Sequence, residues 1–205
     1  MRTLAIETAT EACSVALFDG EEVVAARHEE LGRGHAERLV PLIAELPARG
    51  KADRILVSLG PGSFTGTRIG IAAARALGLA WGAQVLGYPT LELVALCARE
   101  QLGAVPVLVA MNGGHGEWLV QPFDAAGQSS QGHLSLPPTK AAALSTVEHV
   151  AGSRAHELVE QRGFGQALPL LPDAKLGIGL PPECLAPRLA PIYARAPDAK
   201  PAAGG

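Results

Sequence analysis

The glycine-rich stretch that begins at Gly60 has the composition of a phosphate-binding turn. It follows the apolar run "RILVSLG" and leads into the helix-forming segment "TRIGIAAARALGLAWG". Free N–H groups and the helix dipole attract anions at such a junction. Gly60, Gly62 and Gly66 give the pattern G-x-G-x-x-x-G, and Thr67 and Arg68 follow where a Walker A motif requires a lysine and then a Ser or Thr. We therefore treat Gly60 and Gly62 as weak candidates for nucleotide binding.

A second weak candidate lies near the N-terminus, in the segment "IETATEACS". Glu7 ends an apolar run, and Thr8 follows it. An acid at the end of a strand, followed by hydroxyl groups, can lie near a metal-bound phosphate. The same residues can also cap a turn with their side-chain oxygens. The six histidines show no H-x-x-x-H or H-E-x-x-H pair, and no acid–base pair can be recognised. We predict no catalytic residue and no metal ligand.

Small residues recur at every fourth position after the glycine turn and predict a stripe along one face of a helix. The stripe consists of Gly66, Gly70, Ala74, Gly78 and Gly82. A glycine inside a helix costs roughly 0.8 to 1 kcal/mol relative to alanine, so close packing must recover that loss. Two interpretations are open: the stripe packs on the protein's own sheet, or it contacts the helix of another chain, as small residues do in membranes.

The composition limits the classes of protein to which the chain can belong. Its 205 residues carry a formal net charge of −3, which argues against a protein that binds nucleic acid strongly by itself. Its three cysteines are far apart in the sequence, which fits a reducing compartment. No signal peptide and no apolar run of roughly 18 to 20 residues is recognisable. We expect a cytoplasmic protein without a membrane segment.

The order of the predicted elements indicates two α/β lobes. Three antiparallel strands open the chain, with a hairpin turn at Asp19 to Glu22, and helices then alternate with strands. A helix from 34 to 46 carries an apolar face formed by Leu39, Leu42, Ile43 and Leu46. A new strand pair follows Gly103, so the pattern starts again there. Residues 125–142 read as a loop, and the Pro- and Ala-rich segment after Leu180 reads as weakly structured.

Three segments resemble the bacterial TsaB (YeaZ) family. They are "MRTLAIETATEACSVALFDG", "GPGSFTGTRIGIAAARALGLA" and "LAPIYAR". The resemblance covers most of residues 1–100, and residues 125–180 match only loosely. It implies an actin-like, Hsp70-like fold of two RNase H-like lobes, with mixed sheets flanked by helices. The expected division is an N-terminal lobe at 1–100, a shortened C-terminal lobe at 101–190 and a flexible tail at 191–205.

The resemblance also implies a function, namely the formation of N6-threonylcarbamoyladenosine in tRNA. Proteins of this family are the non-catalytic subunit that pairs with the paralogue TsaD, and the ATPase TsaE joins the complex. ATP and a metal would then belong to the partner subunits, and tRNA would be bound through the complex. The family was once described as an M22-type glycoprotease, which would require two histidine ligands that this sequence does not supply.

Two departures from the family pattern remove features that a phosphate site could use. Glu7 stands where the family usually has Asp, and Asn112 and Gly113 replace an acid and an arginine. The resemblance therefore favours contact over catalysis for the glycine stretch. It implies an interface, with TsaD or with a second copy, formed by Leu39, Leu42, Ile43, Leu46, Gly66, Gly70, Ala74 and Gly78. The alternative is a small ATPase or kinase of the actin-like fold that uses Glu7, Thr8 and the Gly60–Gly66 turn around magnesium and ATP.

Overall fold

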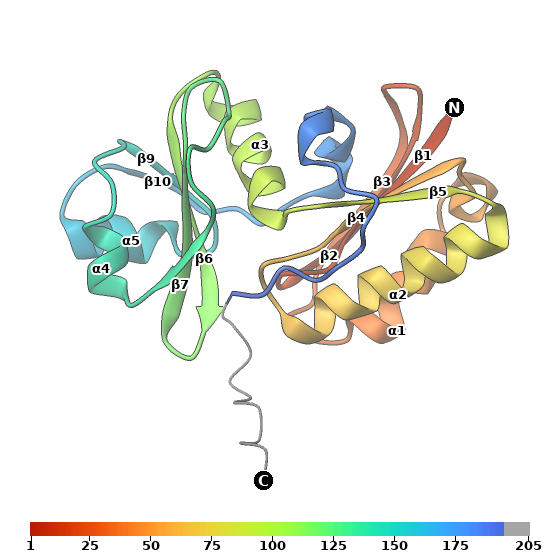
Figure 1. Ribbon diagram of the computed structural model, residues 1–205, viewed down its shortest axis with the longest axis horizontal. Helices are drawn as coiled ribbons and strands as arrows, with labels where there is room; N and C mark the ends of the chain where they lie inside the picture. Colours follow the sequence, from red (N-terminus) through yellow and green to blue (C-terminus); the bar gives the residue numbers. More distant parts are fainter. Residues whose placement is uncertain (195–205) are drawn as a thin grey trace, which may run out of the picture.

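The computed structural model describes residues 1–194, and its first lobe is built on a five-stranded mixed sheet (Figure 1). The strands lie in the order β3-β2-β1-β4-β5. β1, β2 and β3 are antiparallel neighbours, whereas β4 and β5 run parallel to β1. Their bounds are Arg2–Glu7 for β1, Ala12–Asp19 for β2, Glu22–Glu30 for β3, Arg54–Ser58 for β4 and Gln84–Tyr88 for β5. The three antiparallel strands and the turn at Asp19 to Glu22 confirm the prediction for this part of the chain.

Two helices cover one face of this sheet and lie side by side in Figure 1. They are α1 (His35–Ala44) and α2 (Phe64–Trp81), and the short 3-10 helix η1 (Pro47–Gly50) follows α1. Side chains of β1 and β4 such as Leu4, Ile6 and Val57 form a core with the inner faces of both helices. The apolar spacing therefore predicted the helix around Leu39 correctly.

The second lobe repeats the topology of the first. Its strands lie in the order β8-β7-β6-β9-β10, which matches β3-β2-β1-β4-β5 strand for strand. β6, β7 and β8 are antiparallel neighbours, and β9 and β10 run parallel to β6. Their bounds are Val107–Gly114 for β6, Glu117–Phe123 for β7, Leu134–Leu136 for β8, His149–Ala151 for β9 and Gln166–Leu168 for β10. The repeat confirms the expected fold of two α/β lobes, and the last three strands have only three residues each.

Helices pack on both faces of the second sheet. α4 (Pro138–Ala142) and α5 (Ala155–Arg162) cover one face, whereas α3 (Thr90–Leu102) covers the other and lies between the two lobes in Figure 1. The expectation of a plain loop from 125 to 142 was wrong, because β8 and α4 form there. Both are very short, and a local pattern of so few residues is too weak to distinguish from a loop.

After the second lobe the chain returns to the first. The 3-10 helices η2 (Ala174–Gly179) and η3 (Pro182–Cys184) follow β10, and η2 packs on β1, β2 and α3. The backbone N–H of Ala174 donates to the Ser14 hydroxyl at 2.9 Å. Ala186 and Ile192, which lie farther along this segment, anchor it to the first lobe. Ala186 exchanges backbone hydrogen bonds with Gly87, and the Ile192 N–H donates to the Leu59 carbonyl at 2.7 Å.

The expected end of the C-terminal lobe at residue 190 stays a prediction, although the returning segment contacts the N-terminal lobe. Of the expected tail, residues 191–194 lie within the described part and the rest lie outside it. No helix of the described residues is both long and apolar enough to cross a membrane.

Candidate functional site between the two lobes

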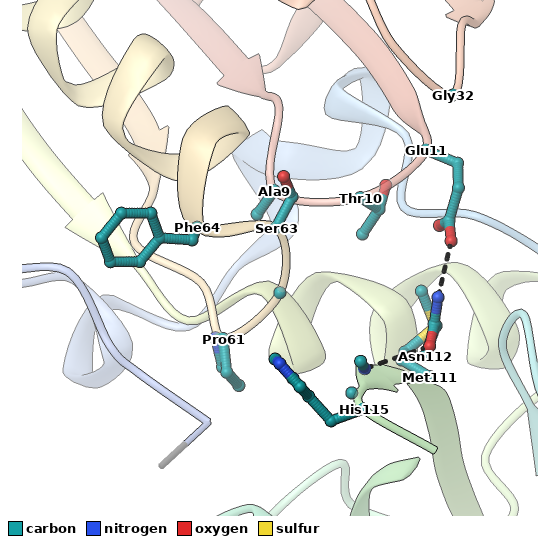
Figure 2. Close-up of a pocket in the computed structure, with 13 residues that line it drawn as sticks. Ala9, Thr10, Glu11, Gly32, Pro61, Ser63, Phe64, Met111, Asn112 and His115 are labelled. Atoms are coloured by element: carbon teal, nitrogen blue, oxygen red, sulfur yellow. Dashed lines mark hydrogen bonds between the residues drawn. The ribbon is translucent and has the colours of Figure 1, made fainter. Parts of the chain in front are cut away.

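A cleft of about 310 Å³ opens between the lobes (Figure 2). Three connections form its walls: the turn after β1 at Ala9–Glu11, the turn before α2 at Pro61–Phe64, and the β6–β7 hairpin at Met111–His115. These connections leave the corresponding ends of β1, β4 and β6, so the repeated topology brings them together. Gly32 completes the lining. The cleft is therefore the place in this fold where a ligand could contact both lobes.

The N-terminus of α2, which the sequence suggested as an anion site, is occupied by the protein's own chain. Ser63 caps the helix, and its hydroxyl accepts a 3.1 Å hydrogen bond from the Gly66 N–H. The Ser63 N–H itself donates to the Ala9 carbonyl at 2.6 Å. A Cβ at Gly62 would overlap the same carbonyl. A phosphate would have to displace this turn, because the carbonyl of Ala9 lies where the anion would need a donor.

Glu7 does not face the cleft. Its side chain is completely buried, and its carboxylate accepts a 2.6 Å hydrogen bond from the Ala9 N–H and a 3.4 Å bond from the Tyr88 hydroxyl. Burial raises the pKa of the Glu7 carboxyl to about 7, although these hydrogen bonds and one with Ser58 oppose the shift. A carboxylate held inside the core in this way does not fit a metal–phosphate site.

Thr8 and Gly60 also have structural partners. The Thr8 hydroxyl donates to the Gly66 carbonyl at 2.8 Å, which fixes the end of β1 to the first turn of α2. Gly60 has a φ of 86°, in the left-handed region, and a Cβ there would lie 2.8 Å from the Ile192 carbonyl oxygen. Glu7, Thr8, Gly60 and Gly62, the weak candidates for nucleotide binding, thus all form contacts within this chain.

The opposite wall of the cleft contributes Asn112 and the glycines that follow it. The Asn112 amide group donates a 3.5 Å hydrogen bond to Glu11 across the cleft, as Figure 2 shows, and its oxygen accepts one of 3.1 Å from the Gly114 N–H. His115 reaches from the hairpin toward Pro61. No lysine or arginine occurs among the described lining residues, whereas Glu11 supplies a carboxylate. The cleft therefore offers little attraction to a triphosphate, and the residues present do not fit ATP.

The eight residues predicted to form a partner interface lie inside the first lobe. Leu39, Leu42, Ile43 and Leu46 are buried in the core between the helices and the sheet, and Ala74 joins them. The glycines pack against this chain's own strands: a Cβ at Gly70 would overlap the Thr8 hydroxyl, and one at Gly78 would overlap Val85. In the described structure these residues face this chain's own sheet rather than solvent. The stripe lets α2 approach β1, β4 and β5, which is the alternative that the spacing left open.

The outer faces of the same two helices are exposed and, beside charged residues such as Glu37 and Arg75, carry small or apolar side chains. On α1 they are Ala36, Val40 and Ala44, and on α2 they are Ala72, Ala76 and Leu79. Val40 is 57% exposed and Leu79 is 89% exposed. The alanines on the outer face of α2 repeat at every fourth position, like the residues of the buried stripe, and spacing alone does not say which face points to the sheet.

Comparison with known proteins identifies the family. The family model described as "TsaD: tRNA N6-adenosine threonylcarbamoyltransferase" matches residues 22–170. The chain belongs to the TsaD family. Within it, the chain resembles the tRNA threonylcarbamoyladenosine biosynthesis protein TsaB of Escherichia coli, with 41% identity over 122 residues. That match covers 57% of this chain and 52% of the relative, and TsaB of Bacillus subtilis is 32% identical over 61% of this chain and 51% of its own length. The chain thus spans about half the length of these curated relatives.

A solved structure extends the similarity over nearly the whole chain. YeaZ from Pseudomonas aeruginosa is 27% identical, superposes with a TM-score of 0.78, and is matched over 94% of this chain and 99% of its own length. The tRNA N6-adenosine threonylcarbamoyltransferase of Anaeromyxobacter dehalogenans is 34% identical over 56% of this chain and 41% of its own length. The similarity to the TsaB and YeaZ proteins confirms the resemblance to the TsaB family that the sequence motifs indicated.

Proposed function

We propose that this chain is the non-catalytic, TsaB-type subunit of the cytoplasmic complex that forms N6-threonylcarbamoyladenosine in tRNA. It pairs there with a TsaD-like paralogue, and a TsaE-like ATPase joins the complex. The observation that carries the proposal is the combination of TsaD-family membership with a cleft whose own side chains do not fit a nucleotide. Glu7 is buried, and the turn after β1 fills the start of α2.

The proposal leaves ATP, the metal and the transfer chemistry to the partner subunits. A catalytic subunit must hold its phosphate-binding groups free before the substrate arrives, because preorganised donors carry most of the electrostatic stabilisation. In this chain the corresponding groups form bonds within the fold: Ser63 with Ala9, and Thr8 with Gly66. The rival function, a small ATPase or kinase, would require those bonds to break.

The outer faces of α1 and α2 are the surface that we propose for the TsaD-like partner or for a second copy of the chain. Val40 and Leu79 are large apolar side chains that a monomer leaves in water, and the alanines around them allow another helix to approach closely. The proposed interface lies on the two helices that the resemblance suggested, but on the faces opposite to the buried apolar residues of α1 and the small-residue stripe of α2.

Two measurements test the function. The chain should co-purify from its native cell with a TsaD-like protein in equal amounts. A mixture with that protein, a TsaE-like ATPase, threonylcarbamoyl-adenylate synthase, ATP and tRNA should form the modified adenosine, as measured by mass spectrometry of the nucleosides. The same mixture without this chain should lose most of the product. Equal product with and without the chain would contradict the proposal.

A further inference from the structure

An aromatic and cationic cluster lies at the start of α2, at the rim of the cleft that Phe64 helps to line and beside the segment that returns from the second lobe. Phe64 is 56% exposed, and in Figure 2 its ring points away from the other labelled residues of the cleft. The guanidinium carbon of Arg68 lies 3.6 Å from the centre of that ring. Arg68 also donates a 2.9 Å hydrogen bond to the hydroxyl of Tyr193, which is 40% exposed. The two ring centres are 5.8 Å apart.

The positive charge at this place is not neutralised within the described residues. Arg68 forms no ion pair with them, and neither does Arg75, which donates to the Leu189 carbonyl at 2.8 Å. The first turn of α2 contains no acidic residue, so the positive end of the helix dipole adds to the charge. The chain as a whole is acidic, with a net charge of −3, and the uncompensated charge of Arg68 beside two exposed rings is therefore a local exception.

We propose that Phe64, Arg68 and Tyr193 form a contact site for a single-stranded segment of RNA. Unpaired bases stack on aromatic rings and on guanidinium planes, while arginines bind the phosphates that connect them. Both kinds of group are present here within one exposed cluster. That this RNA is tRNA rests on the proposed function. The inference adds which surface of this chain contacts it.

Ultraviolet crosslinking of the full chain to tRNA tests the site without any partner. At about 50 mM salt, where phosphate contacts are strong, the crosslinked peptides should carry Phe64 and Tyr193. Crosslinks confined to other peptides, or no crosslink at all, would overturn the inference. Crosslinking of the lone chain does not require a TsaD-like protein. It therefore still tests the RNA site if the co-purification experiment contradicts the proposed function.

Variants measured in the complex with the TsaD-like partner separate the contributions. Phe64→Leu removes the aromatic face and should weaken tRNA binding about tenfold, with little change in its salt dependence. Arg68→Ala should weaken binding and reduce the salt slope by about one phosphate contact, whereas Arg68→Lys should keep that slope. Arg2→Ala removes an exposed arginine at the opposite end of β1 and should leave binding unchanged.

Two alternative roles for the cluster give different results. If it only fastens the returning segment to α2, Arg68→Ala lowers the melting temperature and leaves tRNA binding of the folded protein intact. If it is a protein contact, the Phe64 and Arg68 variants fail to assemble with the partner while crosslinking of the lone chain is unaffected. Either result contradicts the RNA site.

Discussion

The Thr8 hydroxyl donates a 2.8 Å hydrogen bond to the carbonyl of Gly66, and a Cβ at Gly66 would overlap the Thr8 carbonyl oxygen. The end of β1 and the first turn of α2 are therefore in backbone contact. Gly66 is required by this closeness rather than by a ligand or a partner.

Gly66→Ala should destabilise the lone chain. The added methyl group overlaps a backbone oxygen, which cannot move away as a flexible side chain could, and overpacking of this kind costs about 1 to 3 kcal/mol or more. Ala72→Ser, on the outer face of the same helix, is the matched control and should change the free energy of unfolding by about 0.5 kcal/mol or less. Urea denaturation of both variants measures the difference. Equal stability of Gly66→Ala and the wild type would mean that α2 does not approach β1 this closely.

Val40→Glu should prevent assembly with the TsaD-like partner and leave the lone chain folded. Val40 is exposed in the monomer, so a charge there has little effect on folding, whereas burying an unpaired carboxylate at an interface weakens binding at least tenfold. Val23→Glu, on the exposed edge strand β3, introduces the same charge away from both helices. Size-exclusion chromatography of each variant with the partner distinguishes them. Assembly that survives Val40→Glu but not Val23→Glu would move the interface to the sheet edge.

The sequence predicted the helices and strands better than it predicted which face of each helix packs on the sheet. Apolar spacing around Leu39 identified α1, and the small-residue period of four identified α2 as a helix with a close contact. The direction of that contact depends in part on β1, which lies far from α2 in the sequence. Ala72 and Ala76 repeat with the same period on the other side of the helix. A residue pattern of one helix cannot resolve two faces that share a period.

The candidate site was predictable only in part for a similar reason. The turn at Gly60 was recognised from its glycines, but the orientation of Glu7 is set by the Ala9 N–H and by Tyr88, which is 81 residues away in the sequence. Tyr193 approaches Arg68 from the far end of the chain, where the Pro-rich composition indicated little structure. Long-range hydrogen bonds of the returning segment, such as that between Ile192 and Leu59, leave no local signal.

The lone chain should not be stabilised by ATP and magnesium. A ligand present at about 100 times its dissociation constant raises the free energy of unfolding by about 2.7 kcal/mol, which a melting curve detects easily. Because the cleft is lined by Glu11 without a described lysine or arginine, we expect no change in melting temperature and no enzyme-like hydrolysis. A turnover near 1 s⁻¹, about the low end of ordinary enzymes, that disappears in Glu11→Gln would favour the ATPase alternative.

The free energy of unfolding of the chain should fall as the pH rises from about 4.5 to about 7, because over this range Glu7 is protonated in the folded state and ionised in the unfolded state. The carboxyl has an ordinary pKa of 4.5 and a folded-state pKa of about 7, because burial disfavours its charge. Between these values the folded state binds more protons than the unfolded state, so the free energy of unfolding decreases with pH. The decrease from this one group amounts to about 3 kcal/mol and is complete above a pH of about 7.

Glu7→Gln should remove this decrease. The amide oxygen can still accept the hydrogen bond from Ala9, and the amide group can donate to the Tyr88 hydroxyl, so the buried site remains satisfied without a charge. Relative to the wild type, the variant should therefore gain stability between pH 5 and pH 8. Glu21→Gln, at an exposed turn, removes a carboxylate of the same kind and should follow the wild-type profile. Urea denaturation at both pH values measures the effect, and parallel profiles for Glu7→Gln and the wild type would show that Glu7 ionises as readily in the core as in the unfolded chain.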